Sequence, residues 1–332
     1  MNTEAELKAL AYLVNGIGRD AMDFSDRTVN LGDDITMDSG NWIPIGSSAK
    51  QFRGSFNGNN HEIIGLKLST GGADQGLFGY ISGSAGIENL TLLDASILST
   101  GTATGGIVGT AAGSSVLSNL TFGAPGDGSR VDGKSQTGGI VGNVTANTVK
   151  LEKCNNYGLI TGTSNVGGIA GQTASGTSAS PVGITNSMNE GAISGDTNVG
   201  GIAGQTGVYN NIEACLNSGK ISGAYNVGGI AGMAGNYTNF GRDIDSADEF
   251  ICINSGEING EFEGSINTMN AGVGGIAGNA GTFAKFYKSE NSGKINVNIK
   301  NSGSNSIIGA GGILGRANQN AELSKCVNSG II

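Results

Sequence analysis

The sequence contains little proline, histidine, aromatic side chain or charge. Its 332 residues include 3 prolines and 1 histidine, and only 5% are aromatic and 14% charged. No run of lysine or arginine is present, so the basic patch that would hold a phosphate backbone is missing and we expect no nucleic-acid partner. No apolar stretch reaches the roughly 18 residues needed to cross a bilayer, so we expect no membrane-spanning helix.

Glycine, by contrast, is abundant, with 61 residues. The scarcity of proline and the lack of a three-residue period exclude collagen, and a hydrophobic fraction of 37% is too high for a disordered chain. Many Gly, Asn, Ser and Thr between regularly placed Ile and Val are typical of short strands joined by tight turns. The first residues, MNTEAELKAL, carry no signal-peptide core, so either the protein is cytosolic or its export signal lies outside this sequence.

The five-residue string GGI[AVL]G occurs seven times, at intervals of 28 to 46 residues, and GLFG at residues 76–79 fits the same frame. Such a period indicates stacked supersecondary units. We expect the isoleucine of each string to point inward and form a ladder, while the glycines allow neighbouring coils to approach closely. The isoleucines are Ile107, Ile140, Ile169, Ile202, Ile230, Ile276 and Ile313.

A second string, Cys or Ser followed by x-Asn-x-Gly-x-Ile, occurs six times. Its asparagines would stack as an amide ladder at a turn, and the glycine two residues later would suit a left-handed turn conformation. The asparagines are Asn156, Asn189, Asn217, Asn254, Asn291 and Asn328. The glycines are Gly158, Gly191, Gly219, Gly256, Gly293 and Gly330.

The cysteines Cys154, Cys215, Cys252 and Cys326 share the first column of this string, with Ser187 and Ser289 between them. Only Cys215 and Cys252 fall in successive coils, and the other pairs would be about twice the ~4.8 Å strand spacing apart. Because the Cβ vectors in one column are parallel, we expect small buried residues rather than a disulfide framework.

These columns predict an all-β fold, a right-handed single-stranded parallel β-helix of about ten coils over residues 28–332, with the repeats from about residue 76. Residues 1–27 are expected to form a capping helix and lead-in. Thr3 and Glu6 mark a capping box, and an apolar stripe beginning at Leu7 predicts a helix over about residues 3–15. Since we find no cap at the other end, we expect further domains or a partner chain to cover it.

The strings NVGGIAGQT and NSGKISG resemble the GLUG repeat of bacterial surface proteins, and TVNLGDDITM, WIPIG and QGLFGYI resemble the usual start of such arrays. The resemblance covers about residues 28–332. It implies a secreted or cell-surface bacterial protein with a role in attachment. That repeat also accompanies the streptococcal immunoglobulin A metallopeptidases, but their HExxH zinc site needs two histidines and this chain has only His61.

Few residues suggest chemistry. His61 is expected to be a solvated turn residue and Trp42 a core or cap aromatic. An acidic segment in the longest repeat offers the only candidate metal ligands, and calcium is the ion its oxygens would suit, although the spacing is not that of an EF-hand. Its members are Asp243, Asp245, Asp248 and Glu249. Otherwise we expect no cofactor.

Two functions remain open. The first is a non-enzymatic, adhesin-like protein that presents loops to a host or microbial surface glycan or protein; its candidate interaction segments are residues 123–134, 173–183, 233–250 and 261–272, where the period swells. The second is a polysaccharide lyase or glycoside hydrolase on the same scaffold, with Glu152 and Glu213 in one outward column two coils apart. Uniform repeats and the absence of a catalytic motif favour the first. Ice binding is disfavoured because no Thr-x-Thr ladder is present.

Overall fold

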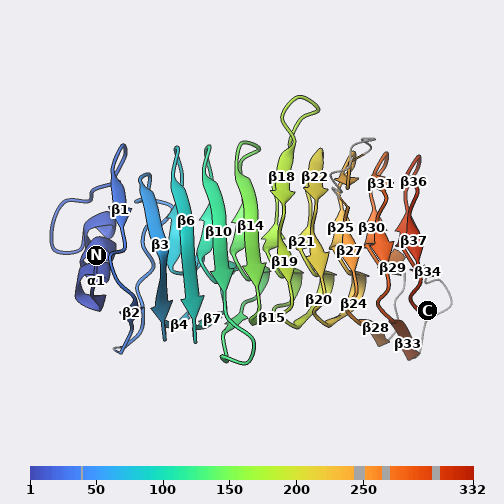
Figure 1. Ribbon diagram of the computed structural model, residues 1–332, viewed down its shortest axis with the longest axis horizontal. Helices are drawn as coiled ribbons and strands as arrows, with labels where there is room; N and C mark the ends of the chain where they lie inside the picture. Colours follow the sequence, from blue (N-terminus) through green and yellow to red (C-terminus); the bar gives the residue numbers. More distant parts are fainter. Residues whose placement is uncertain (39, 243–250, 264–269, 301–306) are drawn as a thin grey trace.

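The computed structural model describes residues 1–332 except 39, 243–250, 264–269 and 301–306. It confirms the predicted parallel β-helix. The chain winds as a right-handed coil whose three parallel sheets run along the length of the rod (Figure 1). The described residues form eight complete turns with an incomplete turn at each end, compared with the ten coils that we expected.

The first sheet has 16 strands. They are β1 (Thr28–Asn30), β2 (Ile35–Thr36), β3 (Ser55–Ile64), β6 (Gly86–Leu93), β10 (Val116–Phe122), β14 (Lys150–Asn156), β18 (Val182–Thr185), β19 (Met188–Asn189), β22 (Asn210–Glu213), β23 (Leu216–Asn217), β26 (Asn239–Phe240), β27 (Ile253–Asn254), β31 (Lys285–Tyr287), β32 (Glu290–Asn291), β36 (Glu322–Ser324) and β37 (Val327–Asn328).

The second sheet has 13 strands and the third has eight. Those of the second are β4 (Lys67–Thr70), β7 (Ser96–Ser99), β8 (Thr102–Gly105), β11 (Arg130–Asp132), β12 (Ser135–Gly138), β15 (Leu159–Thr161), β16 (Ser164–Gly167), β20 (Ile193–Gly200), β24 (Ile221–Gly228), β28 (Ile258–Glu263), β29 (Asn270–Gly274), β33 (Ile295–Lys300) and β34 (Ile307–Gly311). Those of the third are β5 (Phe78–Ile81), β9 (Val108–Ala111), β13 (Val141–Val144), β17 (Ala170–Gln172), β21 (Ala203–Gln205), β25 (Ala231–Ala234), β30 (Ala277–Ala280) and β35 (Leu314–Ala317).

The isoleucines of the GGI[AVL]G strings lie in the interior. Six of them, from Ile107 to Ile276, are fully buried, and Ile313 in the last complete turn is 8% exposed. The glycines beside them stand where coils approach closely, since a Cβ on Gly168 would lie 2.2 Å from the carbonyl oxygen of Gly201. These positions therefore admit no side chain.

The asparagines of the second string form a continuous amide ladder. Each amide nitrogen from Asn156 to Asn291 donates to the amide oxygen of the next asparagine at 2.7 Å. All six asparagines, Asn328 included, also donate at 2.9–3.1 Å to the carbonyl oxygen of the glycine two residues later. The buried amides are thus satisfied from coil to coil, as burial of a polar group requires.

The glycines that follow these asparagines do not adopt the left-handed conformation that we expected. They are needed for space, because a Cβ on Gly191 would lie 2.0 Å from the carbonyl oxygen of Gly158 in the preceding coil. Left-handed backbone occurs instead at Asn165, Asn198 and Asn226, with φ of 52° to 54°. Their side chains form a second amide ladder, with nitrogen-to-oxygen distances of 2.8 and 2.9 Å, and asparagine is among the residues that tolerate this conformation.

The predicted N-terminal helix is confirmed as α1 (Glu4–Asn15). Its N-cap is Thr3, whose hydroxyl accepts from the backbone N–H of Glu6 at 3.3 Å, and Leu7 is among the residues that it buries on the first coil. Figure 1 shows α1 at one end of the rod. Trp42 lies in the adjoining core, 4% exposed, and donates its indole N–H to the carbonyl oxygen of Leu77. No helix among the described residues is long and apolar enough to span a membrane.

Candidate functional site

The segment 173–183 protrudes from the rod between β17 and β18, and it is the tall loop above β18 in Figure 1. A turn at its tip is closed by the backbone bonds between Thr177 and Ser180, and its base is tied to the next coil where Gly176 donates to Val208 at 2.7 Å. Of the other expected interaction segments, 123–134 is fully described and contains β11, whereas 233–250 and 261–272 lie partly outside the described residues.

Three aromatic side chains stack beside this loop. Tyr209, Tyr237 and Phe283 stand just before β22, β26 and β31, and their ring centroids are 4.5 and 5.0 Å apart with interplanar angles of 10° and 14°. Tyr237 and Phe283 are each 38% exposed. All three have left-handed backbone, with φ of 52° to 60°, which is rare for bulky residues and is often found at functional positions.

The stack forms one wall of a groove of about 420 Å³, which we call the aromatic groove. Its floor includes Asn211, Asn239 and Lys285, which occupy one outward column of the first sheet, and Asn239 donates to Asn211 at 3.0 Å. Ser178 of the protruding loop also lines it. Because each ring covers its neighbour's face, the stack offers the groove its ring edges and the hydroxyl groups of Tyr209 and Tyr237.

The sequence reading missed this aromatic column. Each of the three residues stands nine positions after the first glycine of a GGIAG string, namely Gly200, Gly228 and Gly274. A search for periodic aromatics relative to these strings would have found it.

The carboxylates of the enzyme hypothesis do share a column, with Thr185 between Glu152 and Glu213 as expected. Their environments nevertheless differ. Glu213 is 3% exposed, and Arg242 donates to both of its oxygens at 2.7 and 3.2 Å, so its charge is neutralised in place. Glu152 is solvent-exposed beside Lys153. The two carboxylates therefore share a column but not an environment, since one lies in a buried ion pair and the other in solvent.

All four cysteines are free. Three are buried, and Cys326 in the last coil is partly exposed. Burial raises the pKa of the Cys154 and Cys215 thiols to about 12 and that of Cys252 well above its usual range. Each of these three thiols contacts a backbone carbonyl oxygen. Thiols held in the neutral form are poor nucleophiles and poor metal ligands, so we assign them no chemistry.

The acidic segment that we considered for calcium, with Asp243, Asp245, Asp248 and Glu249, lies outside the described residues. Among the described residues, one group has the composition of a metal site: Asp33, Asp34 and His61, whose donor atoms lie within 4.8 Å of one another at the surface. His61 already pairs with Asp34 at 3.1 Å, and Glu62 donates its backbone N–H to the same carboxylate. These hydrogen bonds account for the grouping of His61 with Asp34.

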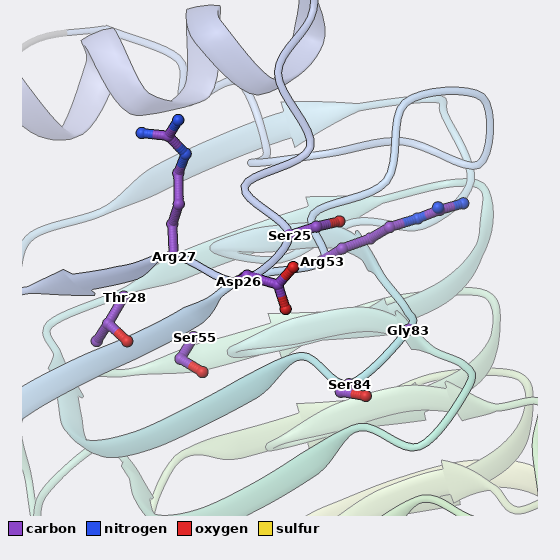
Figure 2. Close-up of a pocket in the computed structure, with 9 residues that line it drawn as sticks. Ser25, Asp26, Arg27, Thr28, Arg53, Ser55, Gly83 and Ser84 are labelled. Carbon is purple, nitrogen blue, oxygen red and sulfur yellow. The ribbon is translucent and has the colours of Figure 1, made fainter.

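A second pocket lies near the capped end and has a volume of about 560 Å³. Figure 2 shows that its two arginines, Arg27 and Arg53, extend in different directions on either side of Asp26. Arg53 lies 3.8 Å from the carboxylate of Asp23 and donates to Gln51 at 3.3 Å. Since the cations do not converge, this pocket lacks the arrangement of an anion site.

No protein-family model and no curated protein matches the chain. A solved structure from Bacteroides ovatus, named as a proposed immunoglobulin A1 protease, is similar over 96% of this chain and 83% of its own, with a TM-score of 0.54 and 19% sequence identity. At this identity the likeness establishes the shared β-helix fold and no more.

Proposed function

We propose that this chain is a non-enzymatic, adhesin-like module of a bacterial surface protein, and that it contacts a surface glycan or protein through the loop 173–183 and the adjoining aromatic groove. The Tyr209–Tyr237–Phe283 stack, in which Tyr237 and Phe283 are exposed, is the observation that carries the proposal. Exposed tyrosine and phenylalanine at rigid positions supply contact area at low entropic cost, and tyrosine and arginine dominate the binding energy of interfaces. Arg242 lines the groove together with Tyr209 and Tyr237.

Export and attachment to a cell surface belong to the same proposal, and the likeness of the repeat strings to the GLUG repeat supports them.

An array of host and microbial glycans and host proteins tests the proposal. We expect the chain to bind at least one ligand class. Replacing the central aromatic, Tyr237→Ala, should lower affinity about tenfold or more, because truncation of a central aromatic anchor commonly costs 2 kcal/mol or more. The matched control is Tyr12→Ala, which removes a tyrosine that is 43% exposed on α1, far from the groove.

Two results would reject the proposal. One is an array on which the chain binds nothing, and the other is a ligand whose affinity Tyr237→Ala leaves unchanged. Release of oligosaccharides from a polysaccharide panel, lost in Glu152→Gln, would replace it with the carbohydrate-active enzyme.

A further inference from the structure

A second groove, of about 600 Å³, lies on the third-sheet side of the same loop, and we call it the amide groove. One outward column of the third sheet crosses it, with Asn143, Gln172, Gln205 and Met233 in direct register on successive strands. None of the residues that line it in the described chain is charged. The amide groove therefore differs in chemistry from the aromatic groove, which contains Glu213, Arg242 and Lys285.

The amides of this column are held at the surface with hydrogen-bonding capacity to spare. The oxygen of Gln172 accepts from Gln136 and Asn165 at 2.9 and 3.0 Å, which fixes its side chain and leaves its amide N–H groups to point elsewhere. The side chains of Asn143 and Gln205 form no hydrogen bond to the described residues, and each is half-buried. A half-buried amide without a protein partner is a ready donor and acceptor for a ligand.

The walls of the amide groove are fixed by internal hydrogen bonds. Thr173 donates to Asn210 at 2.6 Å and accepts from the backbone N–H of Gly207 at 3.2 Å. Ser175 accepts from the backbone N–H of Val208 at 3.1 Å. These contacts join the base of the loop 173–183 to the neighbouring coil, so the groove is formed before any ligand arrives.

We propose that the amide groove binds an uncharged glycan chain that lies along the rod axis. Amide donors and acceptors match hydroxyl groups, and the lack of charge disfavours an anionic or cationic polymer, which would lose hydration without gaining an ion pair. The amides recur once per coil, about 4.8 Å apart, which suits a polymer that presents polar groups at a regular repeat. A peptide strand is disfavoured, because the sheet backbone is already paired between coils and offers no edge here.

This site is separate from the aromatic groove and goes beyond the proposed function. Affinity electrophoresis of the full chain tests it, with gels containing dextran, galactomannan, xyloglucan or mixed-linkage β-glucan, and with polygalacturonate and heparin as charged comparisons. The variant Asn143→Leu/Gln205→Met keeps side-chain size and removes the hydrogen bonds. We expect at least one neutral polymer to retard the chain, and an affinity about tenfold lower in this variant because both amides lose their bonds to the ligand; tenfold corresponds to about 1.4 kcal/mol.

The control is Tyr12→Ala on α1, which lines neither groove and should leave retardation by neutral polymers unchanged. Both amides are partly exposed, so the double variant should keep its unfolding temperature, which circular dichroism will check. The inference is overturned if no neutral polymer retards the chain, if only charged polymers do, or if the double variant binds as the wild type does. If Tyr237→Ala abolishes retardation and the double variant does not, the glycan occupies the aromatic groove; the proposed function then stands and this inference fails.

Discussion

The first coils and the later coils fill the same interior positions with different chemistry. On β6 and β10 one column holds Leu92 and Phe122, and in register with them on β14 stands Asn156, the first member of the amide ladder. The adjacent inward column changes at the same step, from Leu120 to Cys154. All of these side chains are buried.

This difference shows that the coil geometry does not depend on one kind of interior. Large apolar side chains stabilise the first coils by burial of area, whereas small residues and a hydrogen-bonded amide row occupy the same columns later. The second solution works only if every amide has its neighbour, because a buried amide without a partner costs far more than the net gain from one bond. A substitution in the amide row of the later coils should therefore also affect the neighbouring coils. A substitution in the interior of the first coils should affect stability only through the side chain that is replaced.

The largest effect is expected from breaking the row in its middle. Asn217→Leu leaves the amide nitrogen of Asn189 and the amide oxygen of Asn254 without their partners. We expect the free energy of unfolding to fall by about 4 kcal/mol, since one N–H of Asn189, the amide oxygen of Asn254 and the Gly219 carbonyl each lose a buried hydrogen bond. Urea unfolding followed by circular dichroism measures it. Asn239→Leu, which removes a partly exposed outward amide, is the control and should cost under about 1 kcal/mol. Equal effects in the two variants would show that the ladder contributes nothing special.

A smaller loss of stability should distinguish the two kinds of interior in the adjacent inward column, which holds Leu120 and Cys154. Leu120→Ser should cost about 3 kcal/mol, because it opens a cavity in an apolar coil. Cys252→Ser should cost under about 1 kcal/mol, because Ser187 and Ser289 already occupy this column in other coils and are buried there. Parallel urea titrations compare the two. If both substitutions lower the free energy of unfolding equally, the two regions do not differ in this column.

The smallest effect concerns pH, and it applies only to the later coils. The pKa of the Cys154 and Cys215 thiols is raised by burial from 9.0 to about 12. A raised thiol pKa means that the folded state keeps its proton where the unfolded state has lost it, so stability is complete below pH 9 and falls as pH rises toward 12. At pH 9.5 the buried thiols should together lower the free energy of unfolding by about 2 kcal/mol relative to its value at pH 8.

Thermal or urea unfolding at the two pH values measures this loss. The triple variant Cys154→Ser/Cys215→Ser/Cys252→Ser should remove most of it, since serine does not titrate in this range. If the triple variant loses as much stability between pH 8 and pH 9.5 as the wild type, the loss comes from groups other than these thiols.

Most of the fold could be predicted from the sequence. The string GGI[AVL]G gives the coil period, the isoleucine and asparagine columns give the inward positions, and the capping box with Leu7 gives α1. The prediction of a left-handed conformation for the glycines after the ladder asparagines was wrong. A glycine can serve either a left-handed turn or close contact between coils, and the sequence does not distinguish the two. Only the register places the Gly158 carbonyl oxygen where a Cβ on Gly191 would be.

Much less of the candidate site could be predicted. The loop 173–183 was found from the swelling of the period, but Tyr209, Tyr237 and Phe283 are scattered in the sequence and become one stack only when the coils superimpose. The column shared by Glu152 and Glu213 was predicted, yet the partner that neutralises Glu213 was not, because Arg242 lies 29 residues away on the next coil.

The sequence by itself determined that this chain is a coiled rod of parallel strands, because a repeated unit of one glycine-flanked isoleucine and one buried asparagine can satisfy its core only by stacking on its own copies. The tertiary structure alone decided what the surface offers. Side chains that are 28 to 46 residues apart meet there at the spacing of one strand, and the chemistry of an outward column depends on which residues the register brings together.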